Sequence, residues 1–199
     1  MAEEKATVNI NIHGGNNQIL PNATHAEQHI HMPAVPREHR LQHWYKSLRD
    51  EFDNNMLLEQ IRDDIKAYKT KLPNAIGLKQ KLADGGFGEK FYNDANRQKL
   101  RYCKKSTRYQ YYESAQRIDS YLLAKVKSYF DNYVMPLIGI KSKHEIKQAI
   151  YEKVVTPIMD EINRYGVDDD CLCYTDADIY GMLYMLTGNC HINWKDYDD

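Results

Sequence analysis

The stretch YYESAQRIDSYLLAKVKSYFDNYVM, residues 111–135, decides the fold class of this chain. Its apolar and aromatic side chains recur at spacings of three and four, which is the period of one face of an α-helix. The same alternation suits left-handed packing of helices in a bundle. We therefore expect one long helix over 107–135, packed inside a helical bundle. Its predicted inward-facing residues are Tyr111, Ala115, Ile118, Leu122, Val126, Tyr129 and Tyr133.

Helical patterns continue on both sides of this stretch. Ser142 and Glu145 have the spacing of a capping box, which predicts the start of a helix. Pro157 lacks a backbone N–H and is expected to kink that helix. Thr175 can cap a last helix, and Gly188 fits its C-terminal end. The fold class is therefore mainly α: a bundle of five or six helices with a short β-rich N-terminal appendage. The other expected helices cover 41–52, 58–72 and 89–105, with one short helix considered over 77–82. In the first of them one apolar stripe predicts the inward-facing residues Leu41, Trp44, Tyr45, Leu48 and Phe52.

The N-terminal segment 7–32 has a different pattern. In VNINIHGGNNQI, residues 8–19, apolar side chains alternate with polar ones, which is the period of a strand with one apolar face. The Gly-Gly-Asn-Asn run tolerates positive φ and predicts a turn. Two short strands cannot bury an apolar face in water unaided. We expect this segment to pair with copies of itself in a homo-oligomer, or to remain a partly ordered leader. The apolar residues that would carry the association are Val8, Ile10, Ile12 and Ile19.

The domain division follows from the linker MPAVPREHR, residues 32–40. Its two prolines favour an extended chain and oppose helix formation. We predict a leader and linker over 1–38, and one helical domain over 39–199.

Composition narrows the compartment and the partners. The formal net charge of the 199 residues is −1, which makes no global case for binding nucleic acid or a membrane. The N-terminus lacks a secretory signal, and no apolar run approaches the roughly 20 residues that span a bilayer. The four cysteines are expected to be reduced thiols. We predict a cytoplasmic location.

The C-terminal cysteines and histidine are the candidate metal ligands and nucleophile of the sequence. Cys171, Cys173, Cys190 and His191 could be assembled into a zinc site, but structural zinc favours ligand pairs separated by two to four residues. A Cys190–His191 nucleophile and base is disfavoured, because adjacent side chains of an extended segment point to opposite sides. We predict no catalytic residue, no metal and no cofactor. A metal-dependent enzyme stays the least favoured alternative.

A basic block with tyrosines, RQKLRYCKKSTRYQYY, covers 97–112. Aromatic rings could stack on bases while Lys and Arg contact phosphates, so a nucleic-acid-binding protein is the main alternative function. A solvated helix face explains the same charges without a ligand. The residues that would contact nucleic acid are Arg101, Lys104, Lys105 and Arg108.

The C-terminal stretch LTGNCHINW, residues 186–194, has a structural interpretation. After the last helix the chain must leave extended, so that Ile192 and Trp194 can pack back on the bundle. Asn189 and His191 can then hydrogen-bond exposed helix ends. We interpret this stretch as a C-terminal plug beside the long helix. The predicted plug or contact residues are Gln116, Asn189, Cys190, His191 and Trp194.

Five segments together resemble a C-terminal domain of bacterial ABC three-component conflict systems, which are defence operons built around an ABC-type ATPase. The resemblance covers about 56–194, and its most specific pieces are YESAQRI and GMLYMLTGNCHINW. It implies a module that couples an effector or sensor to the rest of the system, and it implies no catalytic residues. The segments are LEQIRDDIKAYKT, GLKQKLADGG, YYESAQRIDSYLLAKVKSYF, IYEKVVTPIMDEI and DIYGMLYMLTGNCHINW.

The chain departs from the usual plan of that family, because a short leader stands where another module is usually attached. We therefore predict a non-catalytic interaction or adaptor module of an antiviral defence system. It is expected to self-associate through its N-terminal strand segment. Its other partners are expected to be protein components of the same system, including an ABC-type ATPase.

Overall fold

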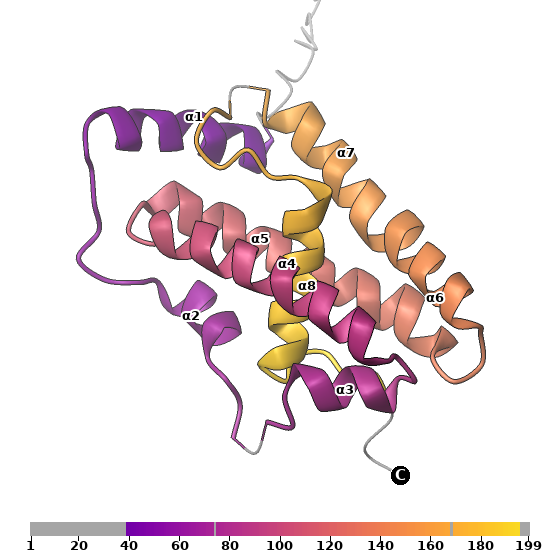
Figure 1. Cartoon of the computed structure of the whole chain (residues 1–199). Coiled ribbons are helices and arrows are strands. Elements are labelled where there is room, and N and C mark those ends of the chain that lie inside the picture. The colour runs from indigo at the N-terminus through magenta and orange to yellow at the C-terminus, as the bar shows by residue number, and fades with distance from the viewer. Residues whose placement is uncertain (1–38, 74, 168, 196–199) are drawn as a thin grey trace, which may run out of the picture. The chain divides into compact units, whose positions relative to one another are not determined.

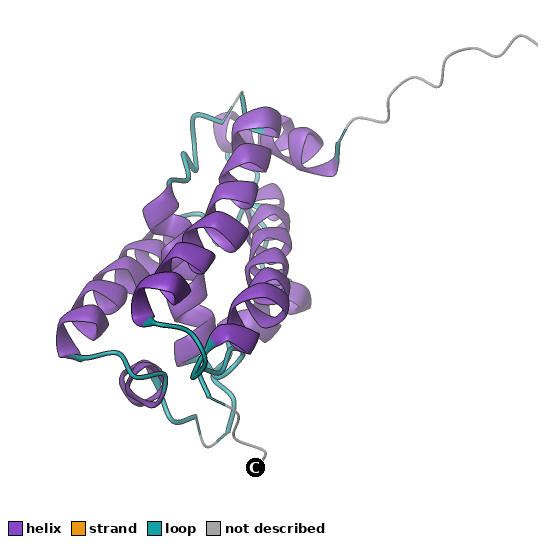
Figure 2. Cartoon of the chain, turned by 90° about the vertical axis from the view of Figure 1, so that its right-hand side faces the viewer, coloured by secondary structure: helices purple, strands orange, loops and turns teal. Residues whose placement is uncertain are grey.

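The computed structural model describes residues 39–73, 75–167 and 169–195. These residues contain helices and connections and no strand, as the colouring of Figure 2 shows. By its contacts the chain forms two units, Met1–Arg37 and Glu38–Asp199, and all helices below belong to the second. The mainly α class is confirmed, whereas the expected β-rich appendage over 1–38 lies outside the described residues.

The described residues form eight α-helices, not the five or six that we predicted. The count is higher because the short helix considered over 77–82 is present as α3, and because the predicted helix after Ser142 is divided in two. Pro157 can donate no hydrogen bond, and the turn Tyr151–Val155 just before it is π-helical. The helices are α1 Arg40–Asp53, α2 Asp63–Lys69, α3 Leu78–Asp84, α4 Glu89–Arg108, α5 Glu113–Tyr129, α6 Lys143–Ile150, α7 Thr156–Tyr165 and α8 Asp176–Gly188.

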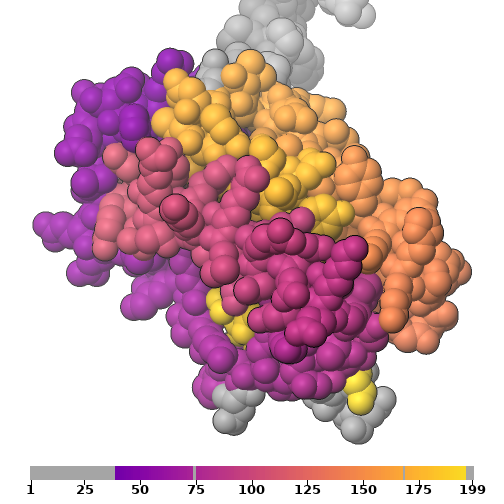
Figure 3. All heavy atoms as spheres, viewed as in Figure 1, coloured from indigo at the N-terminus to yellow at the C-terminus, as the bar shows by residue number. Residues whose placement is uncertain are grey.

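The helix α8 runs through the middle of the bundle, with α4 across it (Figure 1). Ten of its thirteen residues are buried, so it has no polar face. A helix that is apolar all round is stable only where other elements surround it. Here α3, α4 and α5 all contact it, and Figure 3 shows the magenta side chains of α3 and α4 over its lower part.

Close packing of α4 on α8 depends on Gly181. A Cβ atom at this position would lie 2.5 Å from the carbonyl oxygen of Gln98 and 2.6 Å from Cβ of Tyr102. Any side chain at residue 181 would therefore push the two helix backbones apart.

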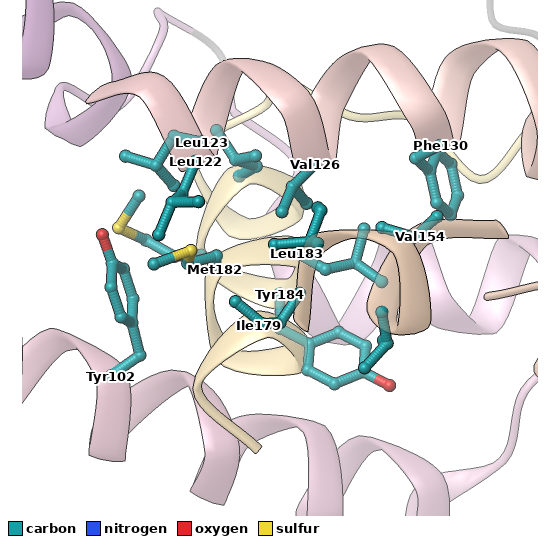
Figure 4. Packing of buried hydrophobic residues seen from close by; sticks show 14 of the residues in the cluster. Tyr102, Leu122, Leu123, Val126, Phe130, Val154, Ile179, Met182, Leu183 and Tyr184 are labelled. Atoms are coloured by element: carbon teal, nitrogen blue, oxygen red, sulfur yellow. The ribbon is translucent and has the colours of Figure 1, made fainter. Parts of the chain in front are cut away.

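The opposite face of α8 packs on α5 (Figure 4). Protein interiors are close-packed, so a change in the volume of a side chain at this contact is expected to be destabilising. The buried residues that meet there come from α4, α5, the π-helical turns and α8; they include Tyr102, Leu122, Leu123, Val126, Phe130, Val154, Ile179, Met182 and Leu183.

The helix predicted over 107–135 begins only at Glu113, because α4 extends to Arg108 and a turn separates the two helices. Tyr111 lies in that turn and is exposed, and Tyr133 in the π-helical turn after α5 is exposed as well. Both were expected inward, so the prediction was wrong for them. The predicted capping box of α6 is confirmed: Ser142 Oγ accepts from Glu145 N–H at 3.3 Å, and the Glu145 carboxylate accepts from Ser142 N–H at 2.9 Å.

None of the helices in the described part of the chain is both long enough and apolar enough to cross a membrane.

Candidate functional site

The end of α8 is a Schellman motif two residues beyond the predicted stop. Gly188 is still helical, and Cys190 takes the left-handed conformation with φ of +68°. The His191 N–H donates to Leu186 O at 2.9 Å, and the Cys190 N–H donates to Thr187 O at 3.2 Å. These bonds satisfy carbonyls that a helix end leaves free and turn the chain back toward the bundle.

The returning chain inserts Trp194, which is fully buried, between α8 and the α3–α4 connection. Its indole N–H donates to Thr187 Oγ1 at 3.0 Å, and that hydroxyl donates to Leu183 O at 2.9 Å. The ring lies edge-on to Phe87, with centroids 5.3 Å apart. Gly85 leaves room for the indole, since a Cβ atom there would lie 3.1 Å from Cβ of Trp194.

Lys81 of α3 is buried beside the same segment and was missed by the sequence analysis. Its ammonium donates to Ile192 O at 2.8 Å and to Asn193 Oδ1 at 2.7 Å. Burial lowers the pKa of Lys81, because the charged form loses water. A signal was present, since Lys81 lies on the same helical stripe as Leu78 and Leu82.

Asn189 and His191 bind the C-terminal end of α2. The side-chain amide of Asn189 donates to Tyr68 O and to Lys69 O, each at 3.1 Å. The carbonyl of Asn189 accepts from Leu72 N–H at 3.2 Å. His191 Nε2 lies 3.2 Å from Thr70 O, so the tautomer with hydrogen on Nε2 donates here.

Gln116 lies at the other end of α2. Its carbonyl oxygen accepts from Arg62 N–H at 2.7 Å, while its amide donates to Gln110 O at 2.6 Å. The side chain of Arg62 also reaches Glu113, with 3.4 Å between Nη1 and Oε1. A seven-residue helix is about 10 Å long, so Gln116 and Asn189 meet opposite ends of α2. We call Gln116, Asn189 and His191 the α2 clamp.

The structure therefore divides the predicted plug. Asn189, Cys190, His191 and Trp194 lie in one C-terminal turn, whereas the hydrogen bonds of Gln116 go to residues 62 and 110. The link between Gln116 and this turn is α2 itself.

Cys190 lies at the base of the C-terminal turn. Burial raises the pKa of its thiol, but a backbone hydrogen bond from Gly77 and the Lys81 ammonium outweigh this effect, and the net shift is downward. Cys171 and Cys173 lie in the connection before α8, and burial raises the pKa of each. The four cysteines are free thiols, and no group of three or more His, Cys, Asp or Glu side chains within the described ranges could hold a metal ion.

Two of the four predicted nucleic-acid contact residues, Arg101 and Lys105, pair instead with a buried carboxylate. Asp178 of α8 is fully buried; Lys105 Nζ lies 2.8 Å from it and Arg101 Nε 3.7 Å. Lys105 also donates to Cys173 O at 3.1 Å. Opposite charges at these distances offset the loss of water around Asp178.

Two of the four tyrosines of the predicted nucleic-acid surface lie inside the protein. Tyr102 and Tyr109 are buried and cannot stack on bases. Arg108 lies 5.5 Å from the ring centre of Tyr109, and Lys104 is exposed on α4. The inner side of this basic block therefore packs within the bundle, and its outer side is charged.

A second buried carboxylate, Asp119 of α5, was also missed by the sequence analysis. The hydroxyls of Ser106 and Tyr174 both donate to it. Burial raises the pKa of Asp119, and these two hydrogen bonds offset part of the shift. No local pattern revealed this network, because its members come from α4, α5 and the connection before α8.

An exposed apolar cluster lies where the connection after α1 passes the α4–α5 turn, at the left of Figure 1. The Leu58 N–H donates to Tyr111 O at 2.7 Å and joins the two segments. Glu51 accepts from the N–H and the hydroxyl of Ser114, at 3.0 and 2.6 Å, and fixes the end of α1 to the start of α5. We call this cluster the apolar patch; it consists of Phe52, Met56, Leu57 and Tyr111, which are 44%, 59%, 52% and 43% exposed.

Phe52 was expected inward with the rest of α1, and the structure contradicts this. Its ring lies at the rim of the patch, 5.8 Å from the ring of Tyr112. The predicted association residues Val8, Ile10, Ile12 and Ile19 lie outside the described residues.

The fold and these contacts define a helical domain in which α5 and the C-terminal turn bind the α2 segment. Residues 77–194 match the family model of C-terminal domain 9 of the ABC-three component (ABC-3C) systems. The match covers more than half of the chain, which therefore belongs to this family of bacterial conflict and defence systems. The resemblance seen in the sequence is confirmed, and membership implies other proteins of the system as partners. No curated protein and no solved structure matches the chain.

Proposed function

We propose that this chain is a non-catalytic interaction module, an adaptor that binds another protein of its ABC-3C system through the apolar patch. The observation that carries the proposal is the exposure of Phe52, Met56, Leu57 and Tyr111, which lie on two segments that the Leu58–Tyr111 hydrogen bond joins. Contiguous apolar surface costs free energy in water, and Phe, Met and Tyr are enriched where proteins meet.

The frame under the patch supports this proposal. Glu51 makes a two-point contact with Ser114 at the N-terminal end of α5, where a carboxylate also interacts favourably with the helix dipole. A patch that is held in place before binding loses less entropy when a partner covers it. The proposed partner is the ABC-type ATPase of the same system.

The test is complex formation between the purified full chain and that ATPase, measured by size-exclusion chromatography with light scattering and by calorimetry. Met56→Ser/Leu57→Ser/Tyr111→Ser should weaken binding by about a hundredfold or more, since hot-spot residues contribute at least about 2 kcal/mol. The matched control is Ile140→Ser/Val167→Ser, which removes two highly exposed apolar side chains elsewhere. Unchanged binding by the patch variant, with its melting temperature retained, would contradict the proposal.

Self-association is the second part of the proposal. It rests on the alternation of Val8, Ile10 and Ile12 with Asn residues, which predicts one apolar strand face that needs a partner. Val8→Asp/Ile10→Asp/Ile12→Asp should reduce the mass of the full chain in light scattering to that of a protomer. Asn9→Asp/Asn11→Asp adds charge to the other face of the predicted strand and should leave the chain with the mass of an oligomer. Equal masses for all three proteins would contradict this part.

The absence of catalysis is the third part. It is supported by the family resemblance, which carries no catalytic residues, and by the use of Cys190, His191 and Lys81 in holding the C-terminal turn. Elemental analysis of the purified chain should show no stoichiometric metal. One bound metal ion per chain would contradict a non-catalytic adaptor and favour the enzyme alternative.

A further inference from the structure

The helix α2 is attached to the bundle in a different way from the helices around it. It has seven residues, and Ile65 is its only buried side chain. Ile61 just before it and Tyr68 within it are partly buried against the core. Helices of this length do not persist alone in water, so the surface beneath α2 must supply its stability.

That surface recognises the backbone of the segment at five atoms. They are the N–H groups of Arg62 and Leu72 and the carbonyl oxygens of Tyr68, Lys69 and Thr70. Binding through backbone groups is how many proteins hold short peptides, with selectivity left to a few side-chain pockets. The buried Ile65 and the partly buried Tyr68 fill that role here, in an Ile-x-x-Tyr turn.

The surface that holds α2, which we call the receptor, lies within the range matched by the family model, whereas the segment that fills it lies before that range. Gln116, Asn189 and His191 fall within the matched range 77–194, whereas α2 precedes it. The family domain therefore provides a surface that holds a segment supplied from outside it.

We propose that the surface of α5 and α8 beneath α2 is a peptide-docking site, which the chain fills with its own residues 61–72. Its ligand in trans is a segment of a second protein of the system that forms one helical turn with an aliphatic residue and a tyrosine three positions later. That segment takes the place of α2. The proposal is independent of the apolar patch, whose residues make none of these contacts.

The experiment measures binding of a fluorescent peptide with the sequence of residues 58–72, LEQIRDDIKAYKTKL, to the full-length chain. In the wild type α2 occupies the site, so binding is weak. Ile65→Ser in the chain weakens the internal occupant and leaves the clamp intact. The peptide should then bind at least about tenfold more tightly, because the affinity scales with the fraction of free sites. A peptide in which the residues that correspond to Ile65 and Tyr68 are both replaced by Ser should not bind.

Clamp variants identify the surface to which the peptide binds. Adding Asn189→Ala to the Ile65→Ser chain should weaken peptide binding about tenfold, whereas adding Asn163→Ala, an exposed residue on α7, should not. Variants of the apolar patch should leave peptide binding unchanged, which separates this test from that of the proposed function.

A second way to free the site protects the test if Ile65→Ser does not fold. Arg62 has φ of −62°, which proline can adopt, and its N–H donates to Gln116. Arg62→Pro therefore removes one bond of the internal segment without altering the receptor. If a folded chain with either change binds the peptide no better than the wild type, α2 is a permanent part of the core and the inference is wrong.

Discussion

The helices α8 and α2 touch each other and yet are stabilised by opposite means. The longer α8 buries ten of thirteen residues and depends on apolar packing against α3, α4 and α5. The shorter α2 buries one residue, Ile65, and is otherwise held by hydrogen bonds that the α2 clamp makes to its backbone.

The two helices therefore differ in how they are expected to unfold. Removal of α8 would expose the whole core at once, so its loss is equivalent to global unfolding. Release of α2 exposes little apolar surface and breaks a few bonds that water can replace, so it can occur locally. The two helices therefore make distinct predictions for substitution and exchange experiments.

The largest effect is expected at the C-terminal end of α8. Trp194→Ala removes a fully buried indole and the donor to Thr187, and should lower the free energy of unfolding by about 4 kcal/mol. Urea unfolding measures this loss. Trp194→Phe retains most of the ring and should cost less than half as much; an equal loss for both would show that the hydrogen bond, not packing, dominates.

Gly181→Ala should cost about 2–3 kcal/mol, because the new methyl would meet the α4 backbone at Gln98. The same measurement on Gly88→Ala provides the control, since a Cβ atom at residue 88 would have nothing within 4 Å. A neutral Gly181→Ala would mean that α4 and α8 can separate freely, and that the core is less tightly packed than α8 requires.

Ile65→Ala should cost about 2 kcal/mol and act locally. Hydrogen exchange read by mass spectrometry should show faster exchange in peptides covering 61–70, with protection of α8 retained. Equal loss of protection in α2 and α8 would remove the distinction between the two helices.

The clamp itself is expected to contribute less. Asn189→Ala leaves two carbonyls at the end of α2 without this donor and should cost about 1 kcal/mol, or about 3 °C in melting temperature. His191→Ala should lower the melting temperature by a smaller amount, because its single bond is exposed. If His191→Ala leaves stability intact but abolishes partner binding, His191 is a contact residue and not part of the plug.

The smallest effect is a pH dependence from Asp119. Burial raises its pKa in the folded chain above the unfolded value of about 3.9. The ionised carboxylate therefore costs stability, and the cost appears as pH rises from the unfolded value through the folded one. The free energy of unfolding of Asp119→Asn minus that of the wild type should therefore increase as pH rises through this window, because only the wild type is destabilised by ionisation. Urea unfolding at several pH values tests the sign, and a difference that falls with pH would contradict it.

Much of the helical architecture was predictable from local pattern. Ser142 and Glu145 started α6 where expected, because a capping box involves residues three apart and needs no distant partner. Leu41, Tyr45 and Leu48 were predicted inward and are buried. Their stripe continues to Phe52, which is exposed because no element covers the end of α1, and periodicity alone cannot show where coverage stops.

The candidate site was less predictable, since its bonds join residues far apart in the chain. Lys81 binds a carbonyl 111 positions away, and Asn189 binds two carbonyls 121 and 120 positions away. The sequence showed that Asn189 and His191 could bond helix ends, but not which helix. Gln116 was placed beside the C-terminal turn, whereas the structure places it across α2.

The amino-acid sequence by itself determined that this chain is helical, where α6 begins, and to which bacterial family it belongs, because periodicity, caps and family motifs are local properties. Only the tertiary structure decided that α8 is the central helix and that α2 is held by its backbone. Burial and hydrogen bonding of these elements depend on which distant surfaces meet, and that follows from the packing of the whole chain.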